Sequence, residues 1–229
     1  MTRGSDSAAD DLAQDPGELF DVYRADGEPT GRTKPRAAVH RDGDWHRAVH
    51  VWVAGRDDET GPFLLMQRRS RAKDTWPGVL DVTVGGHYRA GESLADTLRE
   101  TEEEIGVTVT LGSLIPLGIR VTAWEEPETG LYDRELQDVF LLLDDRPLVD
   151  YRPHPAELAE LLRIPLAALI DLQRGNPEPI VVDRIAPGDV AAQQTTIGSG
   201  DFVPTIDRYV LRVALATERV LRGDRDVLI

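Results

Sequence analysis

Short runs of apolar and β-branched residues are separated by turn-forming glycine, proline and aspartate along the first two-thirds of the chain. Runs of this length and composition are typical of β-strands, and the residues between them are typical of turns. The pattern predicts strands over 18–24, 46–53, 63–67, 79–84 and 136–143, one or two strands within 107–124, and a hairpin loop over 57–62.

A helical period replaces this pattern in the middle of the chain. Leu94, Leu98 and Ile105 fall on one face of a helix, so we expect a helix over about 92–106 that ends at Gly106. Strands mixed with a few helices indicate either an α+β fold or an α/β/α sandwich with a mixed sheet between helices. The remaining elements are expected to be a short helix beginning at 154–155, helices over 164–173 and 203–222, and a loop over 183–201.

The chain divides into three parts by composition. Residues 1–16 are small, polar and acidic and have no apolar face, so we predict a disordered tail. Residues 17–175 carry the strand and helix patterns and are expected to form the main domain. Residues 176–229 form a C-terminal extension whose final helix is expected to cover the site or to form a homodimer.

The charge of the chain disfavours duplex nucleic acid as a partner unless a local basic patch overrides it. The 229 residues carry a formal net charge of -15, and such a surface repels the backbone of duplex nucleic acid. Binding of small phosphorylated ligands is still compatible with this charge, because a metal ion can supply positive charge locally. The sequence has neither an apolar run of about 18 residues nor a secretion signal, so we expect no membrane span and a cytoplasmic location.

Three carboxylates gather on the helix predicted over 92–106. Glu100, Glu103 and Glu104 stand at i, i+3 and i+4, opposite the apolar stripe. Like charges so close repel one another, and two of them lie in the last turn, where the helix dipole disfavours negative charge. A hard divalent cation such as Mg²⁺ would relieve this repulsion. Taken alone, the helix is equally consistent with a solvated acidic face.

The residues around this helix resemble the Nudix box, G-x5-E-x7-R-E-U-x-E-E-x-G-U, in which U is apolar. Two features differ from that pattern. Six residues rather than seven separate Glu92 from Arg99, and Thr101 stands where an apolar residue is usual. Seven fixed positions match, namely Gly86, Glu92, Arg99, Glu100, Glu103, Glu104 and Gly106.

The resemblance implies a Nudix hydrolase with an α/β/α sandwich, a mixed β-sheet, an N-terminal extension and a C-terminal helix. It also implies that the three glutamates and the carbonyl group of Gly86 bind Mg²⁺ or Mn²⁺, and that Arg99 orients the glutamates. A metal-activated water would then attack a small-molecule diphosphate, such as a nucleoside diphosphate joined to another group. The general base is expected to be Glu103 or Glu104, with Glu135 and Glu157 as outside candidates.

Three further residues are candidates for substrate binding. Arg68 and Arg69 end a predicted strand, where adjacent side chains face opposite ways, so only one is expected to reach a phosphate. His87, directly after Gly86, is the third candidate. A catalytically inactive Nudix-like ligand sensor is the weakest reading, because all three glutamates are present.

The stretch from His40 to Glu104 is also similar to the type I isopentenyl diphosphate isomerases, a branch of the same fold. Those enzymes use a cysteine directly before the Gly-His pair to move a proton, whereas this chain has Gly85 there and no cysteine at all. Isomerase activity is therefore disfavoured, and the chain is most similar to a hydrolase subgroup that shares these motifs over about residues 18–170. The shared motifs are His46-Arg47-Ala48, Gln67-Arg68-Arg69-Ser70, Lys73-Asp74-Thr75-Trp76-Pro77-Gly78 and Gly86-His87.

The same resemblance implies a second metal site. A single histidine near a strand is more often a packed or surface residue than a ligand, but the group as a whole corresponds to the additional site of the isomerases. Its expected ligands are His40, His46, His87, Asp133 and Glu135.

Overall fold

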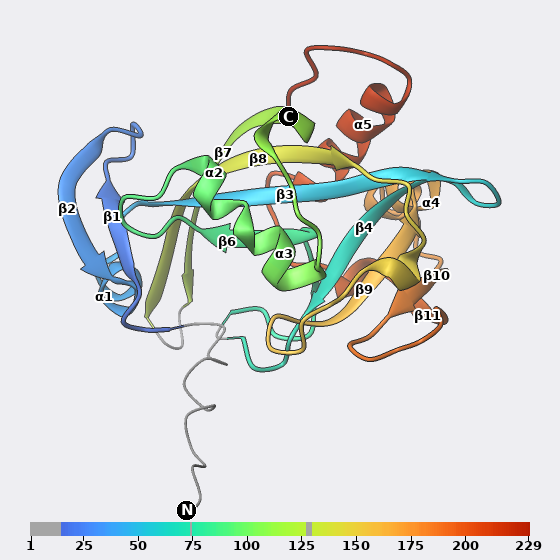
Figure 1. Cartoon of the computed structure of the whole chain (residues 1–229), viewed down its shortest axis with the longest axis horizontal. Coiled ribbons are helices and arrows are strands. Elements are labelled where there is room, and N and C mark those ends of the chain that lie inside the picture. Colours follow the sequence, from blue (N-terminus) through green and yellow to red (C-terminus); the bar gives the residue numbers. More distant parts are fainter. Residues whose placement is uncertain (1–14, 74, 127–129) are drawn as a thin grey trace, which may run out of the picture.

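The central feature of the fold is a mixed β-sheet with helices on both faces (Figure 1). A computed structural model describes residues 15–73, 75–126 and 130–229. The strands of this sheet are β3 (His46–Asp57), β4 (Gly61–Arg69), β5 (Leu80–Asp81), β6 (Val84–His87), β7 (Leu114–Glu126), β8 (Leu131–Leu143), β9 (Leu158–Pro165), β10 (Ile180–Ile185) and β11 (Gln193–Ile197). Their order is β11-β10-β9-β4-β3-β8-β7, with β5 beside β4 and β6 beside β3. Strand β3 runs parallel to β8 and antiparallel to β4 and β6, which makes the sheet mixed, as predicted.

The two faces of the sheet bury alternate residues of its central strand. Val51 and Val53 of β3 point into one core layer, and Trp52 points into the other, because side chains alternate along a strand. Helices α2 (Leu94–Thr97) and α3 (Arg99–Ile105) lie against the first layer. Helices α4 (Leu166–Gln173) and α5 (Tyr209–Leu221) cover the second. The predicted α/β/α sandwich is confirmed.

A small N-terminal unit stands beside one end of the sheet (Figure 1). Strands β1 (Leu19–Tyr23) and β2 (Pro29–Pro35) form a separate antiparallel pair, and α1 (Arg36–Asp42) follows directly. Phe20, Val22 and Val39 form its own buried core. Because α1 packs against β8, this unit brings His40 to the main sheet.

The structure differs from the predicted elements at several places. The strand expected over 79–84 is divided into β5 and β6, and neither β2 nor α1 was predicted. The helix expected over 92–106 is divided at Leu98 into α2 and α3. The helix expected at 154–155 is wrong: a turn there leads into β9. The loop expected over 183–201 is wrong in part, because β11 pairs with β10. The helix expected from 203 begins only at Tyr209, after Arg208 takes a left-handed conformation with φ of 53°.

Physical reasons for these differences lie in the local sequence. Strand β11 reads Gln-Gln-Thr-Thr-Ile, which has no apolar alternation because most of the strand is exposed at the sheet edge. Pro204 precedes the left-handed Arg208, so the segment before α5 cannot continue a regular helix. Short 3₁₀ turns complete the fold at Leu111–Ser113, Leu148–Asp150 and Ser199–Asp201.

The domain boundaries of the sequence analysis stay a prediction. Residues 1–14 of the expected tail lie outside the described residues. Strands β10 and β11 of the C-terminal extension continue the main sheet rather than form a sheet of their own. Within the described ranges, no helix is both long enough and apolar enough to cross a membrane.

Candidate active site

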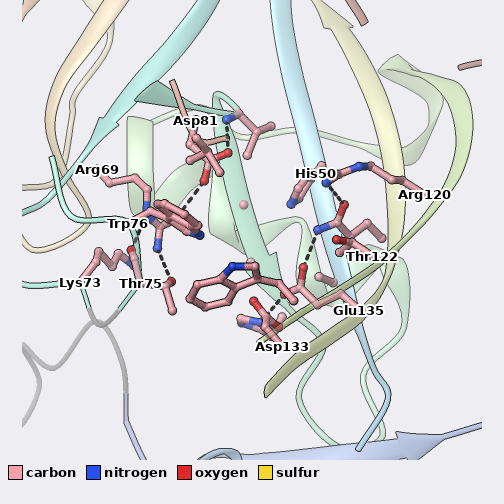
Figure 2. A pocket seen from close by; sticks show the side chains of 18 of the residues that line it. His50, Arg69, Lys73, Thr75, Trp76, Asp81, Arg120, Thr122, Asp133 and Glu135 are labelled. Carbon is pink, nitrogen blue, oxygen red and sulfur yellow. Dashed lines mark hydrogen bonds and ion pairs between the residues drawn. The ribbon is translucent and has the colours of Figure 1, made fainter. Parts of the chain in front are cut away.

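One cavity of about 780 Å³ brings most of the predicted site residues together. Figure 2 shows Arg69, Lys73 and Trp76 on one side of it and His50, Arg120 and Glu135 on the other. Its lining includes the predicted residues Gly86, His87, Glu100, Glu103, Glu104, Arg69, His40, Asp133 and Glu135. Arg68, Arg99 and His46 do not line it, and each instead contacts residues around it.

The three helix glutamates differ in exposure. Glu104 is buried, with 1% of its surface exposed, and accepts a hydrogen bond of 3.3 Å from Gln67 Nε2 on β4. The expectation that all three face away from the core is therefore wrong for Glu104, because β4 covers it. Burial raises the pKa of Glu100 to about 7 and raises that of Glu104 well above its usual value, helped by the nearby charge of Glu157. Glu103 is exposed.

Arg99 connects three acidic residues at the start of α3. Its Nη2 lies 2.7 Å from Glu100 Oε1, its Nη1 lies 2.9 Å from Glu92 Oε1, and its Nε lies 3.6 Å from Glu103 Oε1. Glu92 also accepts a hydrogen bond of 2.9 Å from the backbone amide of Arg89. Although one residue fewer than in the family pattern separates Glu92 from Arg99, their ion pair still connects the loop that carries Glu92 to α3.

Thr101 occupies an apolar position of the family pattern without leaving a buried polar group unpaired. It is fully buried, and its hydroxyl lies 2.8 Å from the carbonyl oxygen of Leu98 and 2.7 Å from that of Val107. Both oxygens belong to the ends of the segment that carries the glutamates. The single hydroxyl proton can therefore be donated to a carbonyl oxygen at either end of α3, where an apolar side chain would only pack.

Gly86 gives Glu100 its place against the backbone of β6. A Cβ atom at position 86 would lie 2.5 Å from Glu100 Cγ, which is closer than real Cβ contacts come. Glycine therefore lets the carboxylate-bearing side chain lie directly on the strand. This close approach sets Glu100 beside the backbone of Gly86.

A second group of side chains lies nearer the N-terminal unit. Within the described ranges, two sets of metal-ligand types have donor atoms all within 4.8 Å of one another: His40, His46 and His87 form one, and His46, Asp133 and Glu135 form the other. The five residues are those of the expected second metal site. The three helix glutamates do not form such a set.

Hydrogen bonds orient the histidines of this second group. His46 Nδ1 lies 3.2 Å from the carbonyl oxygen of Asp44, which can only accept, so the Nδ1 proton is held there and the Nε2 lone pair faces the group. His87 Nε2 lies 2.9 Å from Glu135 Oε1. Phe20 stacks on both rings, with centroid distances of 5.5 Å to His46 and 4.9 Å to His87. Burial lowers the pKa of His40 and of His87 to about 3, so both are neutral at pH 7.

Most basic residues of the cavity are engaged by acids. Arg69 pairs with Asp81, Lys73 with Glu157, and Arg120 with Asp207. Arg68 is directed elsewhere, to Glu160 and Asp201. Of the described Lys and Arg residues lining the cavity, Arg36 has no carboxylate partner, and its Nη1 lies 3.2 Å from His87 Nδ1.

Several lining residues were not found from the sequence. Arg36, Arg120 and Tyr209 come from α1, β7 and α5, and only the folded chain brings them together. Arg36 does stand one helical turn before His40, which is a usable signal once His40 is assigned to the site. Tyr209 has no comparable signal, because the sequence places it inside an ordinary amphipathic helix.

Comparison with known proteins gives a consistent result. A model of the NUDIX domain family matches residues 44–182. Nudix hydrolase 3 of Arabidopsis thaliana is 39% identical over 151 residues, which is 65% of this chain but 19% of that protein, so the chain spans about a fifth of its length. An uncharacterized Nudix hydrolase of Clostridium acetobutylicum is 33% identical over 66% of this chain and 72% of its own. An isopentenyl-diphosphate Delta-isomerase of Streptomyces avermitilis is 31% identical over 69% of this chain and 77% of its own length.

Proposed function

The chain belongs to the Nudix family, and we propose that it hydrolyses a phosphoanhydride bond of a small organic diphosphate with the help of divalent metal ions. The preferred substrate class is a nucleoside diphosphate joined to another group. The observation that carries this proposal is the buried acidic wall of α3, where Glu100 and Glu104 line the cavity beside Gly86 and both have raised pKa values.

The acidic wall fits a divalent cation better than it fits bare anions. Ten acidic side chains but only five Lys and Arg side chains line the cavity, and four of those five already have carboxylate partners. A diphosphate would be repelled from such a cavity unless cations accompany it. Carboxylate and carbonyl oxygens are the ligands that Mg²⁺ and Mn²⁺ prefer, so Glu100, Glu103, Glu104 and the Gly86 carbonyl would hold the ions. Once bound, the metal would neutralise the diphosphate and make a water molecule more acidic.

The chain's own residues have separable roles in this proposal. Arg99 fixes the rotamers of Glu100 and Glu103 through its ion pairs. Arg69 faces the cavity and is the better phosphate contact, whereas Arg68 is turned to Glu160 and Asp201. Glu103 is the first choice for general base, because it lines the cavity and stays exposed enough to receive a proton from water.

The outside candidates for general base are already occupied. Glu157 forms an ion pair with Lys73, and Glu135 accepts hydrogen bonds from Gln137 and His87. Glu104 remains an alternative to Glu103, but its pKa is held high by burial. A carboxyl group that keeps its proton cannot take one from water, so Glu104 would have to ionise first.

The histidine-rich group supports a second metal site. His46 Nε2 and Asp133 Oδ1 are buried and lack hydrogen-bond partners in the part of the chain that the structure describes, as two ligands of an ion would. Imidazole and carboxylate ligands together suit a transition metal such as Mn²⁺. We propose that this ion lies near the end of the diphosphate that is farther from α3. Its ligands would be His40, His46, His87, Asp133 and Glu135.

This second group also gives the competing isomerase its only structural support. An isomerase of isoprenoid diphosphates needs a thiol at the position of Gly85, which lines the cavity and carries no side chain. Glycine can neither donate nor accept the side-chain proton that the reaction moves. Hydrolysis therefore remains the preferred function, and the predicted homodimer stays a prediction.

A screen that separates and identifies the reaction products by chromatography tests the proposal directly. The full chain is incubated with Mg²⁺ or Mn²⁺ and with ADP-ribose, NADH, nucleotide sugars, dinucleoside polyphosphates, nucleoside triphosphates and isopentenyl diphosphate. We expect metal-dependent cleavage of at least one nucleoside diphosphate derivative, abolished by EDTA. Absence of cleavage across this panel, or conversion of isopentenyl to dimethylallyl diphosphate, would contradict the proposed hydrolase.

A further inference from the structure

His50 lines the cavity between the sheet and the start of α5, apart from both metal-ligand groups (Figure 2). It lies on β3 and pairs in register with Gly85 of β6. Its Nδ1 lies 3.0 Å from the hydroxyl of Tyr209, and the indole Nε1 of Trp52 donates to the same hydroxyl over 2.9 Å. The proposed hydrolysis gives no role to His50, Trp52 or Tyr209.

The hydrogen bonds around Tyr209 fix which nitrogen of His50 carries the proton. The indole N–H of Trp52 can only donate, so the Tyr209 oxygen accepts from it. The Tyr209 hydroxyl proton then has one partner left in the described part of the chain, which is His50 Nδ1. If Nδ1 also carried a proton, the two hydrogens would oppose each other and a buried donor would lose its partner. Burial lowers the pKa of His50, so the ring is neutral and its single proton is on Nε2.

The absence of a side chain at position 85 leaves the Nε2 edge of His50 uncovered. A Cβ atom at Gly85 would lie 3.7 Å from His50 Cδ2, 3.8 Å from His50 Nε2 and 3.1 Å from Val82 Cγ1. Any side chain at this position would therefore extend over the edge of the ring that carries Nε2. No described residue forms a hydrogen bond with Nε2, and the apolar side chains of Trp52, Leu80 and Val82 line the same cavity.

We propose that the Nε2–H group of His50 donates a hydrogen bond to a neutral acceptor on the group joined to the diphosphate. The acceptor is a carbonyl oxygen, a ring nitrogen or a hydroxyl oxygen, as nucleobases and sugars carry. The charges acting on His50 are two acids, Asp81 and Glu135, and two arginines, Arg120 and Arg69, so its surroundings have no excess positive charge that would draw a phosphate to it. The inference rests on the proposed function only in placing a diphosphate at the acidic wall.

The chemistry of this donor separates two substrate classes. An isoprenoid diphosphate has no acceptor outside its phosphates, so it would leave the cavity-facing Nε2–H without a substrate acceptor and would lose that binding energy. A nucleoside or sugar substituent would satisfy it. His50 is therefore a specificity-determining residue that favours substituents with acceptors, next to the position where an isomerase would need its thiol.

Nuclear magnetic resonance tests the tautomer and the contact by a signal of the His50 ring itself, which is a readout other than activity. In the full chain labelled with ¹⁵N-histidine, long-range ¹H–¹⁵N correlations report which ring nitrogen is protonated, and His50→Gln assigns the signals. We expect the Nε2–H form of His50, and a shift of this signal when ADP-ribose, NADH or UDP-glucose is added with Mg²⁺, but not when isopentenyl diphosphate is added. An Nδ1–H form, or a signal that none of the three acceptor-bearing probes moves, would overturn the inference.

Kinetics separate a failure of this inference from a failure of the proposed function. With the nucleoside diphosphate derivative that the unmodified chain cleaves best, His50→Phe is expected to raise KM by at least about tenfold with little change in kcat. His50→Gln, whose amide N–H reaches the same space, is expected to recover most of that loss, whereas His50→Asn, which reaches only Tyr209, is not. Cleavage that is unaffected by His50→Phe rejects the inference alone. A shifted His50 signal without cleavage of any probe rejects the hydrolase alone.

Discussion

His46 Nε2 and Asp133 Oδ1 face each other across 3.7 Å, and neither atom has a hydrogen-bond partner in the described part of the chain. The separation is too long for a hydrogen bond. It is close to the distance between two ligands of one ion, since metal–nitrogen and metal–oxygen bonds are each about 2 Å long. The pair therefore marks a place where an ion would satisfy two atoms that the protein leaves unpaired.

The first prediction follows from this pair. We expect His46→Gln to reduce bound Mn²⁺ by about one equivalent per chain after dialysis, because His46 belongs to both sets of closely spaced ligands. Elemental analysis of the dialysed protein measures the loss. His154→Gln is the matched control, since His154 lines the cavity but belongs to neither set. Equal metal content in the His46 variant and the unmodified chain would show that this group holds no ion.

A second prediction concerns the pH dependence of stability in the metal-free chain. Burial raises the pKa of Glu100 from 4.5 to about 7, so the folded chain keeps a proton that the unfolded chain loses. Stability contributed by this group is therefore full at low pH and falls as pH rises from about 4.5 through about 7. Relative to the unmodified chain, Glu100→Gln should gain about 3 kcal/mol between about pH 4 and pH 8.

Urea unfolding in EDTA at several pH values measures this gain. Glu102→Gln is the control, because Glu102 is exposed on the same helix and outside the cavity. The control should follow the unmodified chain at every pH. If the stability curves of Glu100→Gln and the unmodified chain run parallel, Glu100 does not ionise in a buried site.

The third prediction tests the close approach of Glu100 to β6. Gly86→Ala would place a Cβ atom 2.5 Å from Glu100 Cγ, so the carboxylate must move away from the Gly86 backbone. We expect calorimetric Mg²⁺ affinity to fall by at least about tenfold, which is about 1.4 kcal/mol. Gly112→Ala is the control, because a Cβ atom there meets nothing within 4 Å and φ is not positive. Unchanged affinity in Gly86→Ala would remove Glu100 from the metal site.

The glutamate helix could be predicted because its signals are local. The spacing of Glu100, Glu103 and Glu104 and the cap at Gly106 depend on one short segment, and α3 ends at Ile105 before a left-handed Gly106, as expected. The burial of Glu104 could not be predicted from the same segment. It depends on Gln67 of β4, which lies 37 positions away in the sequence.

Contacts between distant segments set the limit of the sequence analysis for the rest of the site. The five expected ligands of the second group could be named from a family resemblance, but their proximity depends on α1 packing against β8. The sequence did not indicate that residues 203–210 contribute to the cavity wall, because the apolar period there predicts a helix that covers the whole stretch. The left-handed Arg208 delays that helix to Tyr209 and leaves the preceding residues to line the cavity.

A substitution at Glu103 tests whether the acidic face of α3 drives phosphoanhydride cleavage. Formation of the cleavage products by Glu103→Gln is compared with that by Glu102→Gln, its exposed neighbour on the same helix outside the cavity. We predict that Glu103→Gln lowers turnover by at least about a hundredfold, or about 2.7 kcal/mol, while Glu102→Gln keeps normal turnover. Near-normal turnover in Glu103→Gln, with the chain folded and metal bound, would contradict the account.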